Sequence, residues 1–390
     1  MATAVQTRFI PFHLPLIEED DISAVVQVMR NGWITTGPKT HEFEQEFARF
    51  VGAHYAFAVM SCTAALHLGL EAVGLQAGDE VLVPALTFAA TAEVVAYFRA
   101  KPVLVDSEPE YFNIDCRDLL RRITPRTRAI IPVHFAGHPC DMDPILELAR
   151  AHGLAVIEDA AHSFPAKYRG REVGSLSPLT AFSFYATKTL TTGEGGMVTT
   201  DNKQLADRIS LMRLHGLSRD AWKRYHQNGS WRYDIVDAGF KYNLTDIQSA
   251  FGLAQLAKAI STRDRRARIS ERYTQALQEI PAFRLPKANS EVEHAWHLYV
   301  ILIAPEMLTI GRDEMIEELR RRGVGTAVHF IPLHHHSYYQ RKWGYAPGQY
   351  PVVDHYFERC ISLPIYPGMV DADVDQVVEA LIAIYHKFKK

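Results

Sequence analysis

The stretch that decides the fold is AFSFYATKTLTTGEGGMVTTDN, residues 181–202. It begins as a short apolar strand, passes through small hydroxylated residues around one lysine, Lys188, and returns through glycines into a second strand at Met197–Thr200. A lysine between two buried strands is costly unless it has a partner or a chemical role. In a partly desolvated pocket, lysine loses its proton readily and becomes a nucleophile toward carbonyl groups. Taken alone, the stretch is equally compatible with a glycine-rich turn and a solvated lysine.

Asp159 favours the chemical role. It lies in LAVIEDAAHSFPA after the apolar run Leu154–Ile157, where we expect the carboxyl end of a buried strand. Pyridoxal phosphate enzymes need this arrangement, because a lysine binds the aldehyde carbon as a Schiff base while a carboxylate keeps the ring nitrogen protonated. We therefore interpret Lys188 and Asp159 as a pair that holds pyridoxal 5'-phosphate.

The bulk composition excludes several classes of protein. At 390 residues the chain exceeds one ordinary core, so we expect a large domain and a smaller one. The formal net charge of −3 offers no electrostatic footprint for nucleic acid or an anionic membrane. Four scattered cysteines without a C-x-x-C motif argue against a disulfide scaffold or a zinc site and indicate a reducing cytoplasm. The sequence has no signal-peptide pattern and no apolar run long enough to cross a membrane, so we expect a cytoplasmic protein.

Strand and helix patterns alternate along the first part of the chain. Two helices are predicted first, at Leu16–Arg30 and His41–Val51. Strands are then predicted at Tyr55–Met60, Glu80–Pro84, Pro102–Asp106, Arg128–Val133 and Leu154–Asp159, with helices between them at Thr63–Val73, Ala89–Arg99, Arg117–Ile123 and Pro144–His152. This alternation indicates an α/β fold with βαβ units and a mainly parallel sheet covered on both faces. Ligands bind such sheets outside the carboxyl ends of the strands.

A smaller α+β domain is predicted at residues 261–390, after a large cofactor-binding domain at residues 1–260 that includes an N-terminal arm. Its predicted elements are helices at Ile269–Ile280, Arg312–Arg322 and Val374–Phe388 and strands at Trp296–Ile303 and Thr326–Phe330. Before it, a helix is predicted at Ile247–Ile260. An irregular aromatic segment precedes that helix at residues 215–246, and a segment of this kind usually has a function or contacts a partner.

Several side chains are predicted at the same sheet edge as the lysine. The segment MSCTAAL passes from strand to helix, and the helix N-terminus with the Thr63 hydroxyl is suited to a phosphate, although Ser61 and Thr63 could simply cap the helix. Phe88 could stack on a cofactor ring or pack in the core. His162 could meet the ring's phenolic oxygen or be an ordinary hydrogen-bonded residue, and the Ser183 hydroxyl could reach the phosphate.

The histidine run at 334–336 invites a metal interpretation. Three consecutive side chains point in different directions on a strand or a helix, so they cannot all face one ion. We therefore predict no metal site.

The sequence resembles the DegT/DnrJ/EryC1/StrS family of pyridoxal phosphate-dependent nucleotide-sugar aminotransferases. The resemblance covers nearly the whole chain through GWITTGPKTHEFE, SCTAALHLGL, PALTFAATAEVV, VIEDAAHSFPA, FSFYATKTLTTGEGGMV, KYNLTDIQSAFGLAQL, HFIPLHHHSYY and SLPIYP. It implies the fold-type-I architecture and a homodimer with both active sites at the interface. It also implies transfer of an amino group from L-glutamate to a nucleotide-linked keto sugar.

The resemblance also implies roles for single residues. Lys188 would bind the cofactor aldehyde, Asp159 the ring nitrogen, and the backbone at Thr63 and Ala64 the phosphate, together with the Ser183 hydroxyl. Three further positions complete the implied cofactor site: Phe88 near the ring face, His162 near the ring oxygen and Asn243 at the phosphate of the partner subunit's cofactor. His329 matches a position near the sugar in relatives, and the role of Glu194 in the GEGG turn stays open. Arg213 and Arg219 are candidates for binding the carboxylates of glutamate.

The mechanism that follows from the resemblance is ping-pong transamination, with Lys188 as tether and general acid–base. The GEGG turn resembles members that act at C4 of the sugar rather than at C3. A pyridoxal phosphate-dependent sugar dehydratase is an alternative, but such relatives lack the lysine at this point. A non-catalytic nucleotide-sugar sensor on the same fold is the alternative from another class. A nicotinamide oxidoreductase is poorly supported, because no G-x-G-x-x-G follows the first strand.

Overall fold

The computed structural model describes residues 8–218 and 233–390 and is built around a seven-stranded sheet. The strand order is β1 (Tyr55–Val59), β9 (Gly196–Thr200), β8 (Leu179–Ser183), β5 (Ala155–Asp159), β4 (Thr127–Ile130), β2 (Glu80–Pro84) and β3 (Lys101–Val105). Among these strands only β9 runs antiparallel to its neighbours. The predicted α/β fold with a mixed, mainly parallel sheet is therefore confirmed.

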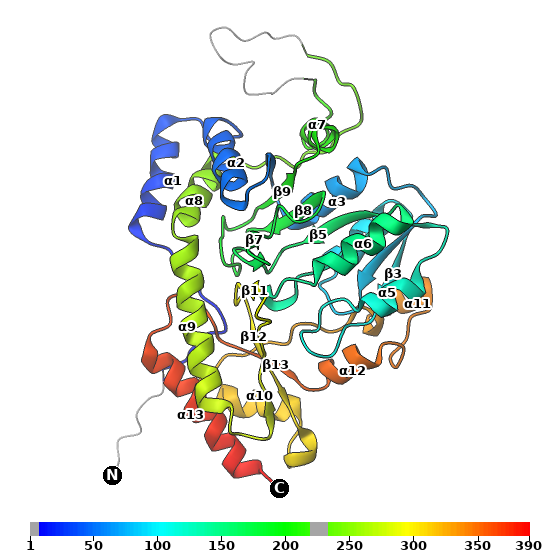
Figure 1. Ribbon diagram of the computed structural model, residues 1–390. Helices are drawn as coiled ribbons and strands as arrows, with labels where there is room; N and C mark the ends of the chain where they lie inside the picture. The colour runs from blue at the N-terminus through cyan, green and yellow to red at the C-terminus, as the bar shows by residue number, and fades with distance from the viewer. Residues whose placement is uncertain (1–7, 219–232) are drawn as a thin grey trace.

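Helices cover both faces of this sheet (Figure 1). One face is covered by α3 (Cys62–Ala72), α4 (Ala90–Tyr97) and α7 (Lys203–Met212), and the other by α2 (Pro38–Val51), α5 (Cys116–Arg122) and α6 (Met142–His152). The side chains of β2 alternate between the two apolar layers, because Val81 and Val83 pack with α3 while Leu82 packs with α2 and α6. This alternation is what a strand buried on both faces requires.

A cluster of phenylalanine rings fixes the strand that leads to Lys188. Phe43 and Phe47 of α2 are fully buried, and the Phe47 ring lies 5.0 Å from that of Phe182 and 5.5 Å from that of Phe184. Aromatic pairs at this spacing add stabilisation beyond the area they bury. The phenylalanine stripe of α2 therefore holds β8, and with it the start of the lysine turn, against the sheet.

The C-terminal part forms a separate small sheet in the order β10 (Phe283–Arg284), β12 (Tyr299–Ile303) and β13 (Cys360–Leu363). Its core includes side chains of α9 (Ala259–Leu277), α10 (Arg312–Arg321) and α13 (Asp371–Phe388). Figure 1 shows α9 as a long helix between this part and α8 (Asp246–Ala257), which packs against α1 (Glu19–Asn31) and α2. The predicted boundary at residues 260–261 falls in the first turn of α9, and the division into two domains stays a prediction.

The N-terminal arm crosses to the C-terminal part. Ile10 is buried in the same core as α9 and α13, and it pairs with Val324. Within the described ranges, no helix combines the length and apolarity that a bilayer crossing needs.

The strand predicted at Thr326–Phe330 is wrong. The segment pairs with β13 at one position, Ala327 with Ser362. Beyond it the hydrogen bonds go to side chains, since His329 Nδ1 lies 2.8 Å from Ser362 Oγ and the His329 carbonyl accepts a bond from the Tyr356 hydroxyl at 2.7 Å. The sequence pattern also missed α11 (Ser337–Trp343), α12 (Pro351–Phe357) and a small sheet of two-residue strands, β11 (Val292–Glu293), β6 (Lys167–Tyr168) and β7 (Arg171–Glu172).

Candidate active site

The sheet topology brings the predicted residues to one edge. Strands β1, β2, β5 and β8 are mutually parallel, so their carboxyl ends share an edge, and β9 begins there because it runs the other way. Thr63 follows β1, Phe88 follows β2, Asp159 ends β5 and Lys188 follows β8. Glu194 lies just before β9. This is the edge at which α/β sheets bind ligands.

Lys188 lies in a tight turn whose backbone is hydrogen-bonded to itself. The Lys188 amide donates to the Tyr185 carbonyl at 2.9 Å, and the Thr192 amide donates to the Phe184 carbonyl at 2.9 Å. Burial lowers the pKa of the Lys188 amine from 10.5 to about 8, and the neighbouring Cys62 and Asp159 partly oppose this shift. The amine is therefore much closer to its nucleophilic, unprotonated form than a surface lysine is.

The carboxylate of Asp159 is buried, with 5% of the residue exposed, and held by three neighbours. One oxygen accepts from the Thr91 hydroxyl at 2.8 Å and the other from the Ala161 amide at 3.1 Å, with the Cys62 thiol 3.8 Å away. Burial raises the pKa of the carboxyl, while the bonds from Thr91 and Ala161 and the charge of Lys188 lower it. Asp159 and Lys188 thus influence each other's protonation. No pattern in the sequence indicates this role for Thr91.

The N-terminus of α3 lies against β9 at the same edge. Ser61 caps the helix, with its hydroxyl accepting from the Ala64 amide at 3.1 Å. A side chain at Gly196 would place its Cβ 2.5 Å from the Ser61 carbonyl carbon and 2.7 Å from the Phe182 carbonyl oxygen. Only glycine allows this approach, which brings the helix N-terminus beside the strand pair that carries Ser183. Amide groups in the first turn of a helix favour a bound anion such as phosphate.

Phe88 is 62% exposed, although it follows a fully buried strand. Its ring lies 6.0 Å from that of Phe330. An exposed aromatic ring at a ligand-binding edge is suited to stacking on a flat ring. The alternative, ordinary core packing, does not fit this exposure.

Four histidines lie within the electrostatic reach of Lys188. They are His13, His162, His297 and His329. Burial lowers the pKa of each, to about 3 for His13 and about 4 for His329, and the charge of Lys188 lowers it further. All four are therefore neutral at physiological pH, each with one donor and one acceptor nitrogen. The sequence offered no signal for His13 or His297.

His162 lies among these rings. It is 5% exposed, its ring centroid is 4.5 Å from that of His297, and its Nδ1 has no hydrogen-bond partner in the described parts of the chain. A buried polar atom without a partner is rare in native proteins and commonly marks a functional site. This observation favours a ligand-facing role over an ordinary hydrogen-bonded histidine.

Asn243 and Arg213 each have hydrogen-bond partners within the chain. The Asn243 amide donates to the Thr36 hydroxyl at 2.5 Å, and its oxygen accepts from Lys241 at 2.6 Å. The Arg213 guanidinium is paired with Glu44 and also donates to the Ala58 carbonyl at 3.2 Å, so its charge is already matched.

The two remaining candidates are Glu194 and Arg219. The Glu194 side chain is exposed, and its backbone carbonyl accepts from Gln248 at 2.7 Å. Arg219 lies outside the described residues.

These residues are of the kinds that pyridoxal phosphate needs as partners. A lysine of lowered pKa and a buried carboxylate lie within reach of each other's charge, and a helix N-terminus and an exposed aromatic ring lie at the same sheet edge. In pyridoxal phosphate, the aldehyde needs a lysine, the ring nitrogen a carboxylate, the phosphate an anion site and the flat ring an aromatic neighbour.

The sequence matches the DegT/DnrJ/EryC1/StrS aminotransferase family over residues 15–382. The chain belongs to this family. It is 48% identical over 377 residues to the spore coat polysaccharide biosynthesis protein SpsC of Bacillus subtilis, covering 96% of this chain and 97% of SpsC.

Solved structures of two proteins are among those similar over almost the whole chain. Spr1654 from Streptococcus pneumoniae in its PMP form has a TM-score of 0.90 and 33% identity, covering 97% of this chain and 99% of that one. The same protein is also known in a PLP form, with a TM-score of 0.89. Helicobacter pylori PseC, an aminotransferase involved in the biosynthesis of pseudoaminic acid, has a TM-score of 0.91 and 26% identity, covering 98% of this chain and 100% of that one.

Family membership shows that the protein is a pyridoxal phosphate-dependent sugar aminotransferase. It therefore acts on a sugar substrate with an amino donor, and it is an enzyme rather than a sensor. The fold-type-I expectation is likewise confirmed by these structures.

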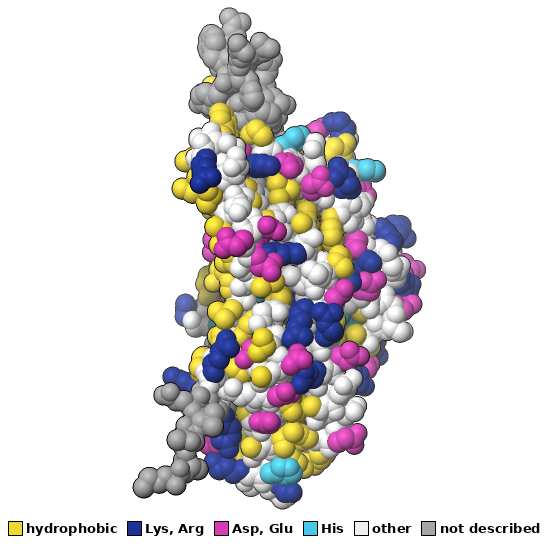
Figure 2. Space-filling view, turned by 90° about the vertical axis from the view of Figure 1, so that its left-hand side faces the viewer, with side chains coloured by type: hydrophobic (Ala, Val, Ile, Leu, Met, Phe, Trp, Pro, Cys, Tyr) yellow, Lys and Arg dark blue, Asp and Glu magenta, His cyan; other side chains and the backbone are white. Residues whose placement is uncertain are grey.

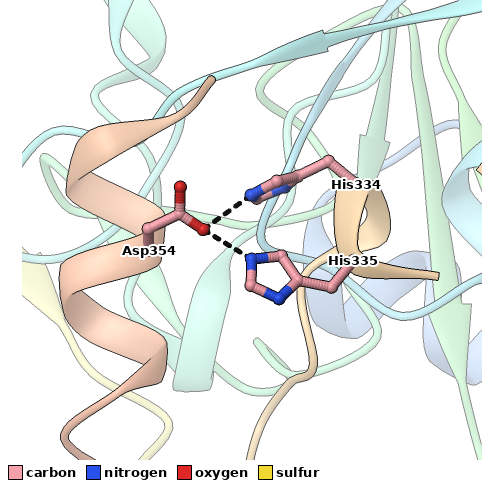
Figure 3. Close-up of side chains that lie close together, drawn as sticks. All are labelled: His334, His335 and Asp354. Carbon is pink, nitrogen blue, oxygen red and sulfur yellow. Dashed lines mark hydrogen bonds and ion pairs between the residues drawn. The ribbon is translucent and has the colours of Figure 1, made fainter. Parts of the chain in front are cut away.

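The three histidines at 334–336 do not all point to one place. His334 and His335 both direct Nε2 at the same Asp354 oxygen, at 2.8 and 2.6 Å, while His336 lies by the Ile331 carbonyl (Figure 3). The three side chains do not all converge, as the sequence argument predicts, but two of them do, because the short 3-10 turn at Leu333–His335 brings His334 and His335 to one side.

The hydrogen bonds of His334 and His335 to Asp354 connect this turn to α12. The second Asp354 oxygen accepts from the Gly348 amide at 2.7 Å. His334 Nδ1 is buried without a partner in the described chain, whereas a metal-bound histidine normally donates a hydrogen bond from its second nitrogen. The absence of a metal site stays a prediction.

Proposed function

We propose that this enzyme transfers an amino group from L-glutamate to the C4 keto group of a nucleotide-linked keto sugar by ping-pong transamination. The observation that carries the proposal is the buried Lys188 amine, with its pKa lowered to about 8, in electrostatic contact with the buried Asp159 carboxylate. A tether that also acts as acid and base needs a pKa near the working pH. A surface lysine would stay protonated.

Each residue of the site has a defined task in this proposal. Lys188 Nζ would hold the aldehyde of the cofactor and would serve as the acid and base that carries a proton at the reacting carbon of the substrate. The Asp159 carboxylate pairs with the ring nitrogen, and Thr91 and Ala161 hold that carboxylate in place. Pyridoxal phosphate, when bound, supplies an electron sink for the carbon that loses its proton.

The remaining residues position the cofactor and substrate. The first-turn amides of α3 at Thr63 and Ala64 bind the phosphate together with the Ser183 hydroxyl, and Phe88 covers one face of the ring. His162 bonds the ring's oxygen, and His329 lies on the sugar side. Support comes from the common sheet edge, the exposure of Phe88 and the shared electrostatic environment of His162 and His329 with Lys188.

The C4 position rests on the turn that follows the lysine. The GEGG sequence at residues 193–196 resembles family members acting at C4. SpsC takes part in spore coat polysaccharide biosynthesis and PseC in the biosynthesis of pseudoaminic acid, so a sugar destined for a surface polysaccharide is a suitable substrate class.

The enzyme is further proposed to be a homodimer with shared active sites. Asn243 would reach the phosphate of the partner subunit's cofactor, and its position beside Val59 places it close to the sheet edge that carries the site. Hydrophobic side chains are exposed between charged ones on the face that carries α1 and α9 (Figure 2), and Ile22, Met29 and Ile260 are among the exposed residues of these helices. A second copy would cover such side chains.

The test is amination of matched nucleotide-linked 3-keto and 4-keto sugars with ¹⁵N-labelled L-glutamate. We expect ¹⁵N to appear at C4 of the 4-keto sugar and the 3-keto compound to remain unreacted. Amination of the 3-keto compound alone would reverse the choice of position. Failure with glutamate but success with another amino donor would contradict the proposed donor while leaving the sugar assignment intact.

A further inference from the structure

The Asp159 carboxylate lies at the end of a chain of two buried threonine hydroxyls. Thr87 and Thr91 are 2% and 1% exposed, and their Oγ1 atoms are 2.7 Å apart. The Thr91 hydroxyl in turn lies 2.8 Å from Asp159 Oδ2. Thr87 belongs to the loop after β2, Thr91 to the first turn of α4 and Asp159 to the end of β5. Three separate parts of the large domain therefore meet in one chain of hydrogen bonds.

This chain has one direction while the carboxylate is ionised. A carboxylate only accepts hydrogen bonds, so the single hydrogen of the Thr91 hydroxyl points to Oδ2. The bond between the two threonines must then use the hydrogen of Thr87. Both hydroxyl hydrogens thus have an acceptor when Asp159 carries its charge.

A proton on the carboxyl group would disturb this match at either oxygen. If Thr91 accepted a proton from Oδ2, its own hydrogen could turn only towards Thr87, whose hydrogen would then have no acceptor among the described residues. At Oδ1 a proton would meet the Ala161 amide at 3.1 Å, which only donates, and the Cys62 thiol at 3.8 Å, which accepts weakly. Buried donors are normally satisfied, so the surroundings favour the ionised carboxylate.

Burial works in the opposite direction, and the neighbours of Asp159 compensate for it. Burial raises the pKa of the Asp159 carboxyl, and four groups that face it lower that pKa. In order of strength they are the Thr91 hydroxyl, the Ala161 amide and the charges of Lys188 and His134. The Cys62 thiol stays neutral, because burial raises its pKa well above the ordinary value. The hydroxyl chain therefore ends in the strongest single contact that favours the charged form.

We propose that Thr87 and Thr91 are positioning residues that form a one-way hydroxyl relay and keep Asp159 in the ionised form that the cofactor ring needs. The inference rests on the proposed function, because it takes the ring nitrogen as the partner of this carboxylate. Both threonines act through Asp159. Without the relay the carboxylate would hold a proton more tightly, and the proton shared with the ring nitrogen would move towards oxygen.

The experiment compares variants that delete one hydroxyl with variants that keep it. Thr87→Val and Thr91→Val remove a hydroxyl at nearly constant shape, whereas Thr87→Ser and Thr91→Ser retain it. Thr199→Val is the matched control, because Thr199 is fully buried and its hydroxyl donates to a backbone carbonyl, that of Gly174 at 2.8 Å.

Two NMR measurements report on the relay. In the cofactor-free protein, ¹³C-labelled aspartate carboxyls are titrated with pH, and the Asp159 resonance is the one that is missing from Asp159→Asn. In the loaded enzyme, ring-¹⁵N-labelled pyridoxal phosphate reports whether the ring nitrogen carries a proton. Thermal unfolding midpoints measure the stability of each variant separately.

We expect Thr91→Val to raise the midpoint of Asp159 protonation by at least about one pH unit, a tenfold change, because a hydrogen bond to a charged group is lost. Thr87→Val should raise it by a smaller amount, since Thr91 keeps its hydrogen but loses the donor behind it. Both serine variants and Thr199→Val should keep the wild-type midpoint. In loaded Thr91→Val the ring nitrogen should carry less of the proton than in the wild type.

An unchanged Asp159 midpoint in Thr91→Val would overturn the inference. A shift in Thr91→Val without one in Thr87→Val would contradict the relay, because Thr91 would then act alone. An equal shift in Thr199→Val would also refute it, since any lost buried hydroxyl would have the same effect. If Thr91→Val does not fold, Thr87→Val carries the test, with Thr87→Ser as its reference. A wild-type ring nitrogen without a proton would instead contradict the proposed pairing of Asp159 with the ring, whatever the midpoints are.

Discussion

At the scale of single residues, Lys188 carries the chemistry. Lys188→Ala removes both the tether and the proton carrier, and general acid–base work alone is worth about 10²–10⁴ in rate. We expect turnover to fall by at least that factor in the amination assay. Lys203→Ala is the control, since Lys203 is an exposed lysine whose partner is Asp207. Near-normal turnover of Lys188→Ala would show that another group does this work.

The lowered pKa of Lys188 predicts a pH dependence. Burial moves the pKa of the amine from 10.5 to about 8, so the unprotonated form increases as the pH rises through about 8. Capture of pyridoxal phosphate by the cofactor-free protein should accelerate over the same range and level off above it. Stopped-flow absorbance at a series of pH values measures this. A capture rate still rising beyond about pH 10, where ordinary lysines titrate, would contradict the buried environment.

Asp159 is tested by the isosteric change to Asn. Breaking a buried charge pair costs about 3–5 kcal/mol, so Asp159→Asn should release the cofactor during dialysis and transaminate poorly. Asp207→Asn serves as the matched control, because Asp207 is an exposed aspartate that pairs with Lys203. Cofactor retention is measured by absorbance and the transamination rate by the amination assay. Wild-type values of both in Asp159→Asn would show that the carboxylate does not have the proposed role.

At the scale of secondary-structure elements, the contact between β9 and the N-terminus of α3 depends on Gly196. A methyl group there would meet the Ser61 and Phe182 backbones at 2.5 and 2.7 Å, and overpacking of this kind costs about 1–3 kcal/mol. Gly196→Ala should lower the unfolding midpoint and weaken phosphate binding. Gly368→Ala, with its nearest atom at 3.9 Å, should change neither. Indistinguishable melting curves for the two variants would show that the contact can relax.

The elements that the sequence predicted well are those with a repeated apolar pattern. The strand at Glu80–Pro84 was predicted with its exact bounds, because five consecutive residues are buried there. The segment Thr326–Phe330 looked equally strand-like, yet its hydrogen bonds go to Ser362 and Tyr356 rather than to a neighbouring ladder. Two-residue strands such as β6 and β7 are too short to produce any period.

At the scale of the whole molecule, the shared-site dimer predicts complementation. If each site takes Lys188 from one subunit and Asn243 from the other, mixed dimers of Lys188→Ala and Asn243→Ala contain one site with both defects and one with none. Activity should therefore reappear when the two inactive proteins are mixed and allowed to exchange subunits. No recovery, with exchange verified by mass-tagged subunits, would indicate that each site is built from one chain.

The site residues that lie at strand ends could be predicted from the sequence. The histidines near Lys188 that come from other parts of the chain could not. Lys188 and Asp159 were recognisable because each follows an apolar strand, and parallel strands share one edge. His13 comes from an irregular arm, and His297 lies just before β12, inside the predicted strand Trp296–Ile303 whose pattern gives no indication of a neighbour at Lys188. Their place beside Lys188 results from the packing of distant segments, which a one-dimensional pattern does not contain.

The central claim is that the Lys188 amine is the group to which the cofactor is bound. The most direct measurement is borohydride reduction of the loaded protein, followed by proteolysis and mass spectrometry of the peptides. We predict a pyridoxyl-phosphate mass on the peptide containing Lys188 and on no other lysine peptide, and its loss in Lys188→Ala. A modification at a different lysine, with the Lys188 peptide unchanged, would contradict the account.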